Sequence, residues 1–260
     1  MPRRSLLIAT AACGLALALV AFATAEITQR GGVRVNFRGT LTPHTLPRSG
    51  SAPVRVAVGA KISATNGQTP PQLQAITIAI NRNGHFDSRG LAQCALRAIQ
   101  PTTTADALAA CRPALVGEGS FSARVLLPQQ TPFPSRGKVY AFNGTYKGHP
   151  AILAHVYGTT PIPTSYTIPF VITKTKGTFG TALSASLPKV TSEWGYITAL
   201  SLTLGRSFSS HGQRRSYLSA GCPAPKGFPG AVFPFARASF AFAGHRTLTS
   251  VLTRACAARG

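Results

Sequence analysis

The sequence is a long series of short stretches in which apolar and polar residues alternate, and Gly or Pro separates nearly all of them. Such an alternation has the period of an extended strand and predicts that one strand face meets a core. Segments of this kind lie at 53–62, 73–80, 121–127, 138–142, 151–157, 166–173, 179–187, 194–204, 215–220, 232–242 and 247–253. In the clearest of them, one face is predicted to carry Trp194, Tyr196, Thr198, Leu200, Leu202 and Leu204.

Turn signals divide these stretches into strands of ordinary length. The pair Asn83-Gly84 tolerates positive φ and predicts a chain reversal. Pro234 interrupts the stretch 232–242, which predicts an edge strand or a bulge there. The pattern favours an all-β chain, an antiparallel β-sandwich or a flattened barrel of about ten to twelve strands. The Pro-rich stretch near 128–136 is a candidate break between subdomains, with a surface loop as the alternative.

One segment departs from the strand pattern. Residues 105–111 are rich in Ala and Leu and lack β-branched side chains, and Thr103 with Asp106 fits the capping pattern of a helix start. We therefore expect a short helix that ends near Cys111. A disulfide from Cys111 to Cys94 would clamp this helix onto the sheet.

Beyond residues 1–25, which are discussed below as an export signal, the chain has four cysteines: Cys94, Cys111, Cys222 and Cys256. An even number in an exported chain indicates disulfides, and three pairings are possible. We favour Cys94–Cys111 and Cys222–Cys256, because cysteines near in sequence close early; the first would contribute about 3 kcal/mol. A zinc site is the alternative, but C-x-x-C and paired-His spacings are lacking, so no metal or other cofactor is predicted.

The N-terminus has the parts of a secretory signal. Arg3 and Arg4 precede an uncharged apolar run from Leu6 to Phe22, which ends in Ala23-Thr24-Ala25. A signal peptide over 1–25 would leave a mature domain of residues 26–260. A membrane anchor is the alternative, although the run is at the short limit for a hydrocarbon core of about 30 Å. A lipid attached at Cys13 is disfavoured, because apolar sequence continues well beyond that residue.

Charge is the most unusual feature of the composition, with 27 Lys plus Arg, five Asp plus Glu and a net charge of +22. Such a field attracts polyanions and anionic surfaces, here an anionic cell-wall polymer, anionic lipid, acidic polysaccharide or extracellular DNA. No run of five or more cations occurs, and no specific nucleic-acid motif is present. A high-GC genome that favours Arg codons is the alternative explanation. The tightest groups, and the candidate polyanion-binding residues, are Arg136, Lys138, Lys174, Lys176, Arg214 and Arg215.

Catalytic motifs are lacking in the sequence. There is no G-x-S-x-G, no G-x-x-x-x-G-K and no G-x-G-x-x-G, and no two histidines have a metal-binding spacing. A carbohydrate-active hydrolase or lyase would have to use His149 or Glu193, with Asp87 or Glu118 as a second acid. This enzyme hypothesis requires those side chains to converge in one pocket.

Aromatic residues near cations offer a second kind of binding surface. Four aromatic residues lie on two neighbouring strand candidates beside Lys138, Lys147 and His149. If exposed, they would form a stacking platform over a basic surface. Cross-strand packing in a core is the alternative for these residues. They are Tyr140, Phe142, Tyr146 and Tyr157.

Several strings resemble a family of exported actinobacterial proteins that occurs as multiple paralogues per genome and has no assigned activity. They are G-L-A-Q-C at 90–94, A-A-C-R-P-A-L-V-G-E-G at 109–119, A-F-N-G at 141–144, G-C-P-A-P at 221–225 and F-P-F-A-R-A-S-F-A-F at 233–242. The resemblance spans most of the mature chain and supports both disulfides, since the strings contain cysteines. It transfers no catalytic residue.

Three functions remain as hypotheses. The first is a non-enzymatic secreted or extracytoplasmic protein, attached to the cell wall or other anionic material through its Arg and Lys side chains. The second is the carbohydrate-active enzyme. The third is a carrier of a small apolar ligand in a hollow β interior, which a large apolar cavity would favour.

Overall fold

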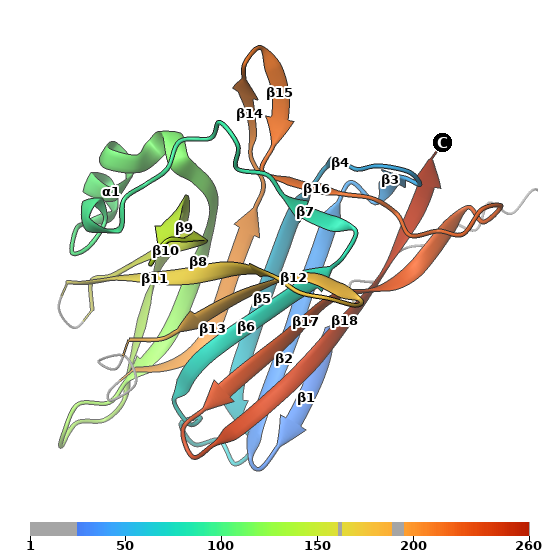
Figure 1. Cartoon of the computed structure of the whole chain (residues 1–260). Helices are drawn as coiled ribbons and strands as arrows, with labels where there is room; N and C mark the ends of the chain where they lie inside the picture. Colours follow the sequence, from blue (N-terminus) through green and yellow to red (C-terminus); the bar gives the residue numbers. More distant parts are fainter. Residues whose placement is uncertain (1–24, 161–162, 189–194, 260) are drawn as a thin grey trace, which may run out of the picture.

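A computed structural model describes residues 25–160, 163–188 and 195–259. Residues 1–24 of the expected signal peptide, and also Glu193 and Trp194, lie outside these ranges. The all-β prediction is confirmed: strands make up most of the chain, with one short α-helix (Figure 1). None of the helices in the described ranges is long and apolar enough to cross a membrane.

Thirteen strands form one curled sheet with the order β1-β2-β5-β13-β8-β9-β10-β11-β12-β6-β17-β18-β3. Neighbours pair antiparallel, except β3, which is parallel to β18. In sheet order the bounds are β1 Glu26–Arg30, β2 Val33–Thr42, β5 Arg55–Ala64, β13 Gly195–Leu204, β8 Leu115–Val125, β9 Phe133–Tyr146, β10 His149–Gly158, β11 Thr164–Lys174, β12 Phe179–Ser186, β6 Leu73–Asn81, β17 Gly230–Phe242, β18 Arg246–Arg259 and β3 Thr45–Pro47.

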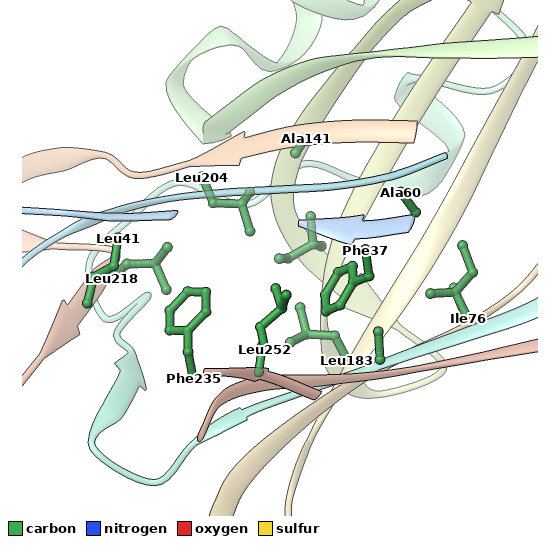
Figure 2. Packing of buried hydrophobic residues seen from close by; sticks show 14 of the residues in the cluster. Phe37, Leu41, Ala60, Ile76, Ala141, Leu183, Leu204, Leu218, Phe235 and Leu252 are labelled. Carbon is green, nitrogen blue, oxygen red and sulfur yellow. The ribbon is translucent and has the colours of Figure 1, made fainter. Parts of the chain in front are cut away.

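The curl brings the first strands of the sheet beside β18, where side chains rather than a backbone ladder join the edges. Thr28 Oγ1 donates to the Thr249 carbonyl at 3.4 Å, and Arg254 Nε donates to the Gly39 carbonyl at 2.7 Å. Across the interior, Phe37 of β2 meets Phe240 of β17 edge-to-face, with ring centroids 6.0 Å apart. The sheet therefore has two walls, and Figure 2 shows apolar side chains of both walls pointing toward each other.

Two small sheets complete the strand structure at the upper end of the molecule in Figure 1. The first consists of β4 Ala52–Pro53, β16 Leu218–Ala220 and β7 Gly84–Phe86, and we call it the cap. The second is a hairpin of β14 Ser207–Ser210 and β15 Gln213–Ser216. The predicted strand 215–220 is thus wrong as one element, because β15 and β16 belong to different sheets.

The predicted helix is present as α1 Thr104–Cys111, with the 3₁₀ turns Leu96–Ala98 and Arg112–Ala114 on either side. Thr103 caps it by accepting a hydrogen bond from the Asp106 amide at 3.2 Å. The helix covers the outer face of β9 and β10, where it buries a second, smaller core that includes Phe142, Leu153 and Ile99. The expected clamp is also present, since Cys94 and Cys111 form a disulfide.

The second predicted disulfide, Cys222–Cys256, joins the segment after β16 to β18. It fixes the cap to the end of the long C-terminal strand. Two disulfides indicate an oxidising, extracytoplasmic environment for this chain.

The expected bulge at Pro234 is present, since the register of β17 against β18 shifts between Pro234 and Ala236. A second bulge, between Ile197 and Ala199 of β13, alters the predicted alternation of that strand. Because one extra residue is inserted there, Ile197 shares the inner face with Leu200, Leu202 and Leu204. The predicted common face therefore holds only from Leu200 onward.

Candidate functional site

Side chains that point inward from the two walls of the curled sheet do not fill the space between those walls. Protein interiors normally pack as densely as organic crystals, so inward-pointing apolar side chains are fully buried. Here fifteen apolar residues that pack against the main core remain partly exposed, and nine of them line one cavity. These nine are Val56, Val58, Ile78, Ile80, Phe86, Val156, Phe170, Leu200 and Leu202.

The cavity has a volume of about 150 Å³ and lies between the walls, directly beneath the cap. Fully buried side chains complete its lining, among them Phe37, Ile152 and Phe240. Leu218 and Phe86, which are paired in the cap, form its upper end. Figure 2 shows Leu218, Phe235, Leu41 and Leu204 around this interior.

Small inward residues occur on the strands around the space. Gly119 and Gly117 of β8 lie opposite Leu202 and Leu204 of β13, and Ala141 follows on β9. These positions bring strands close together but contribute little side-chain volume to the interior. Ala60 and Ala154 line the cavity itself, and side chains of this size fill little of the space between the walls.

The polar lining residues belong to the cap end or satisfy one another. Asn81 Nδ2 donates to the Pro234 carbonyl at 2.8 Å, and Asn81 Oδ1 accepts from the Asn83 amide at 3.0 Å. His85 and Ser219 are paired on the cap and directly follow or precede Phe86 and Leu218 in their strands. Since successive side chains of a strand point to opposite faces, those of His85 and Ser219 point outward. The body of the cavity consequently offers an apolar surface and no charge.

The carboxylates of the enzyme hypothesis lie on separate elements in the described ranges. Glu118 is exposed on the outer face of β8, whereas Asp87 follows β7 in the cap. His149 is exposed at the start of β10, and Glu193 lies outside the described residues. No group of three or more His, Cys, Asp or Glu that could hold a metal ion occurs in this part of the chain.

His155 is the one fully buried histidine of the described ranges, and its contacts stabilise the fold and do not form a catalytic site. Its Nδ1 lies 3.1 Å from the Ile99 carbonyl, which also accepts from Thr167 Oγ1 at 3.1 Å. Burial lowers the pKa of His155, so the ring is held neutral between β10 and the segment before α1.

Asp87 forms the ion pairs of the cap. Its carboxylate accepts from Arg89 Nε at 2.9 Å and from Arg215 Nη1 at 3.1 Å. The hydrogen bond from Arg89 is the largest cause that lowers the pKa of Asp87 to about 2, and Arg215 adds to it. Arg215, a candidate polyanion-binding residue, therefore has a carboxylate partner within the molecule.

The substitution Asp87→Asn should destabilise the protein at pH 7, and most of this effect should be gone at pH 2. The folded pKa lies below the unfolded value of 3.8, so the contribution is complete above about pH 4 and is lost as pH falls through about 2. Solvent around Arg89 screens the pair, which limits the effect to at most about 1 kcal/mol. Urea unfolding of both proteins between pH 2 and pH 7 tests this, and a constant difference over that range would contradict it.

The other candidate polyanion-binding residues occupy three separate places. Arg136 and Lys138 project from the outer face of β9, whereas Arg214 and Arg215 lie on the β15 hairpin. Lys174 ends β11, and Lys176 lies in the turn before β12. The two cations of each pair are close in the structure, as they are in the sequence, but the three pairs do not form one surface.

Helix α1 removes part of the aromatic platform. Phe142 is fully buried beneath α1, so it cannot stack on a ligand, and this corrects its assignment as a platform residue. Tyr140 and Tyr146 pack against the same small core and keep only part of their surface exposed. Tyr157 is partly exposed and lies opposite Lys138 on the outer face.

Sequence reasoning considered a hollow interior but named none of its lining residues. The signal was present in part: the inward positions of 54–62, 76–80 and 200–204 are apolar and alternate with the outward ones. What the sequence lacked was the order of strands around the interior. No protein-family model, curated protein or solved structure matches this chain.

Proposed function

We propose that the protein is a non-enzymatic binding protein that holds a small apolar molecule between the walls of its curled sheet. The observation that carries this proposal is the set of nine inward apolar side chains left partly exposed around one cavity. We further propose that residues 1–25 direct secretion, so that the binding protein is the mature domain 26–260.

Energetics support occupation of the cavity. Apolar side chains around a space that no protein atom fills lack dispersion contacts on that side. A ligand that fills the space restores the missing dispersion contacts. An apolar molecule therefore gains more free energy by binding in the cavity than it would by contact with a fully packed core.

The lining defines the class of ligand. A dry apolar cavity of similar size admits benzene or xenon, so the ligand part inside contains roughly six to eight non-hydrogen atoms. Burial contributes about 0.8 kcal/mol per CH₂, which gives at most roughly 6 kcal/mol for eight carbons and a Kd of about tens of micromolar. A hydroxyl or charge on that part would lack a partner and would weaken binding.

The experiment compares the thermal unfolding of the mature protein with and without toluene, with phenol as a probe of matched size. Toluene at about 100 times its Kd should add about 2.7 kcal/mol and raise the Tm by roughly 5 °C or more. Phenol should give a smaller rise, because its hydroxyl would be buried without a partner. Equal shifts by both probes, or none with toluene, would refute the proposal.

Variants test the location of binding. Val58→Phe places a ring in the free volume and should reduce the toluene-induced rise in Tm at least threefold. Val232→Phe makes the same change at a position with 74% exposure on the outer face of β17, and it should leave the rise unchanged. Val156→Leu, at a lining position on β10, serves as a second filling variant if Val58→Phe folds poorly. Equal toluene responses in filled and control variants would place binding elsewhere.

A further inference from the structure

The strand register gathers basic residues that are far apart in the sequence. Arg38 of β2 pairs with Gly59 of β5, and the same row continues across the outer face to Lys138 of β9. The adjacent row joins Lys61 of β5 to Arg136 of β9. The intermediate residues are Ser201 and Ser120 in the first row, and Ala199 and Ser122 in the second. We call Arg38, Lys61, Arg136 and Lys138, with the strip between them, the basic wall.

The strip between the cations carries small residues, several of them with hydroxyl groups. With strands about 4.8 Å apart, the cations at its two sides are separated by roughly 14 to 19 Å. Gly59 leaves room for Arg38, whose Nε lies 3.3 Å from the point where a Cβ would stand. Ser120 Oγ and Ser201 Oγ lie 2.8 Å apart in the middle of the strip. An elongated molecule can therefore lie across the strip and reach cations on both sides.

The four cations of the basic wall are free of ion pairs within the described ranges. All four side chains are exposed, and the ion pairs found in this part of the chain use Asp87. Glu118 is the one acidic residue on the fully described strands β2, β5, β13, β8 and β9. With one carboxylate against four cations, the outer face of these strands presents an excess of positive charge to a partner.

The opposite wall differs sharply. Its corresponding outer row consists of Ser184, Thr77, Ser239 and Thr249, which carry hydroxyl groups and no charge. Arg237 in the middle of β17 stacks over the Phe179 ring at 4.8 Å, and the remaining cations of these four strands, Arg246, Arg254 and Arg259, all belong to β18. The central rows of the basic wall therefore carry cations where the corresponding row of the opposite wall carries hydroxyl groups.

We infer that the basic wall binds a linear anionic polysaccharide. Charge complementarity favours a polyanion, and serine hydroxyls with Tyr157 beside Lys138 suit sugar hydroxyls and ring faces. A membrane surface would call for several inserted apolar side chains. Of the exposed large ones in the described ranges, Ile27 stands in the row of Lys61, whereas Phe228, Val232 and Val251 lie on other strands and segments. The extracytoplasmic environment indicated by the disulfides favours envelope polymers over nucleic acid.

Retention of the mature protein on immobilised polygalacturonate at low salt tests this inference. The variant R38E/K61E/R136E/K138E should lose affinity more than tenfold and show a shallower dependence of log K on log salt. The control K174E/K176E/R214E/K226E has the same change of net charge at exposed positions elsewhere, and it should lose less than threefold. Thermal unfolding confirms that both variants fold, and the Ala counterparts serve if the Glu variants do not.

Equal losses in the two variants would reduce the effect to net charge and overturn the inference, as would no loss in either. Equal retention on neutral dextran would show that binding does not depend on the charge of the polysaccharide, and would also overturn the inference. Tighter binding of double-stranded DNA or of phosphatidylglycerol vesicles through the same four residues would assign the wall to another partner and contradict the polysaccharide. None of these outcomes depends on toluene binding, so this inference and the proposed function fail separately.

Discussion

The substitution Gly119→Ala is expected to prevent stable folding, with a loss of more than about 4 kcal/mol in the free energy of unfolding. A Cβ at this position would lie far inside van der Waals contact with the Ser201 carbonyl oxygen on β13. That oxygen is backbone and belongs to the neighbouring strand, so no rotamer change relieves the overlap. The two strands would have to separate in the centre of the wall that bounds the cavity.

Gly158→Ala provides a matched control on β10. Its Cβ would make ordinary contacts of 3.4 Å with the Phe121 and Ser135 side chains, and its φ is not positive. We expect a change of less than about 1 kcal/mol. Denaturant unfolding of both variants, followed by far-UV circular dichroism, measures the difference. A Gly119→Ala protein as stable as the control would show that β8 and β13 are not packed as described.

Replacing Cys222 and Cys256 together by Ser should cost about 4 kcal/mol, because the disulfide closes a loop of 34 residues. The double replacement of Cys94 and Cys111, with a loop of 17, should cost about 3 kcal/mol by the same argument. The first pair also anchors the cap, where the Cys222 amide donates to the Pro47 carbonyl at 2.9 Å. Its loss should therefore reduce the toluene response as well.

Guanidinium unfolding of the oxidised wild type and the two double variants measures these effects. Reduction of the wild type should lower its stability by at least as much as either pair of substitutions. A Cys222/Cys256 variant that keeps wild-type stability would contradict a structural role for the bridge.

Local signals were enough for the helix, one disulfide and most of the long strands. Thr103 and Asp106 mark the helix start within one turn, and Cys94 and Cys111 lie close enough in sequence for their pairing to be inferred. Strand β2 was missed although Val33, Val35 and Phe37 alternate with polar residues without interruption. That signal was present and unused. The bulge in β13 was beyond reach, because it depends on the register that β8 imposes.

Neither surface proposed for function could be located from the sequence. Arg38 and Lys61 are far along the chain from Arg136 and Lys138, and they meet only because β13 and β8 lie between β5 and β9 in the sheet. The cavity needs both walls, since Val58 and Ile78 come from opposite sides of the interior. Strand order is a property of the whole chain, so periodicity alone predicts inward faces but not what they enclose.

Methyl NMR of the mature protein titrated with toluene would locate an apolar molecule that occupies the space between the walls. Saturable shifts should appear at the methyl groups of Val58, Ile78 and Ile80, which line the cavity, and be absent at the exposed Ile27. Lining methyls that stay unshifted at saturating toluene, or shifts confined to Ile27 and other surface groups, would contradict binding in the cavity.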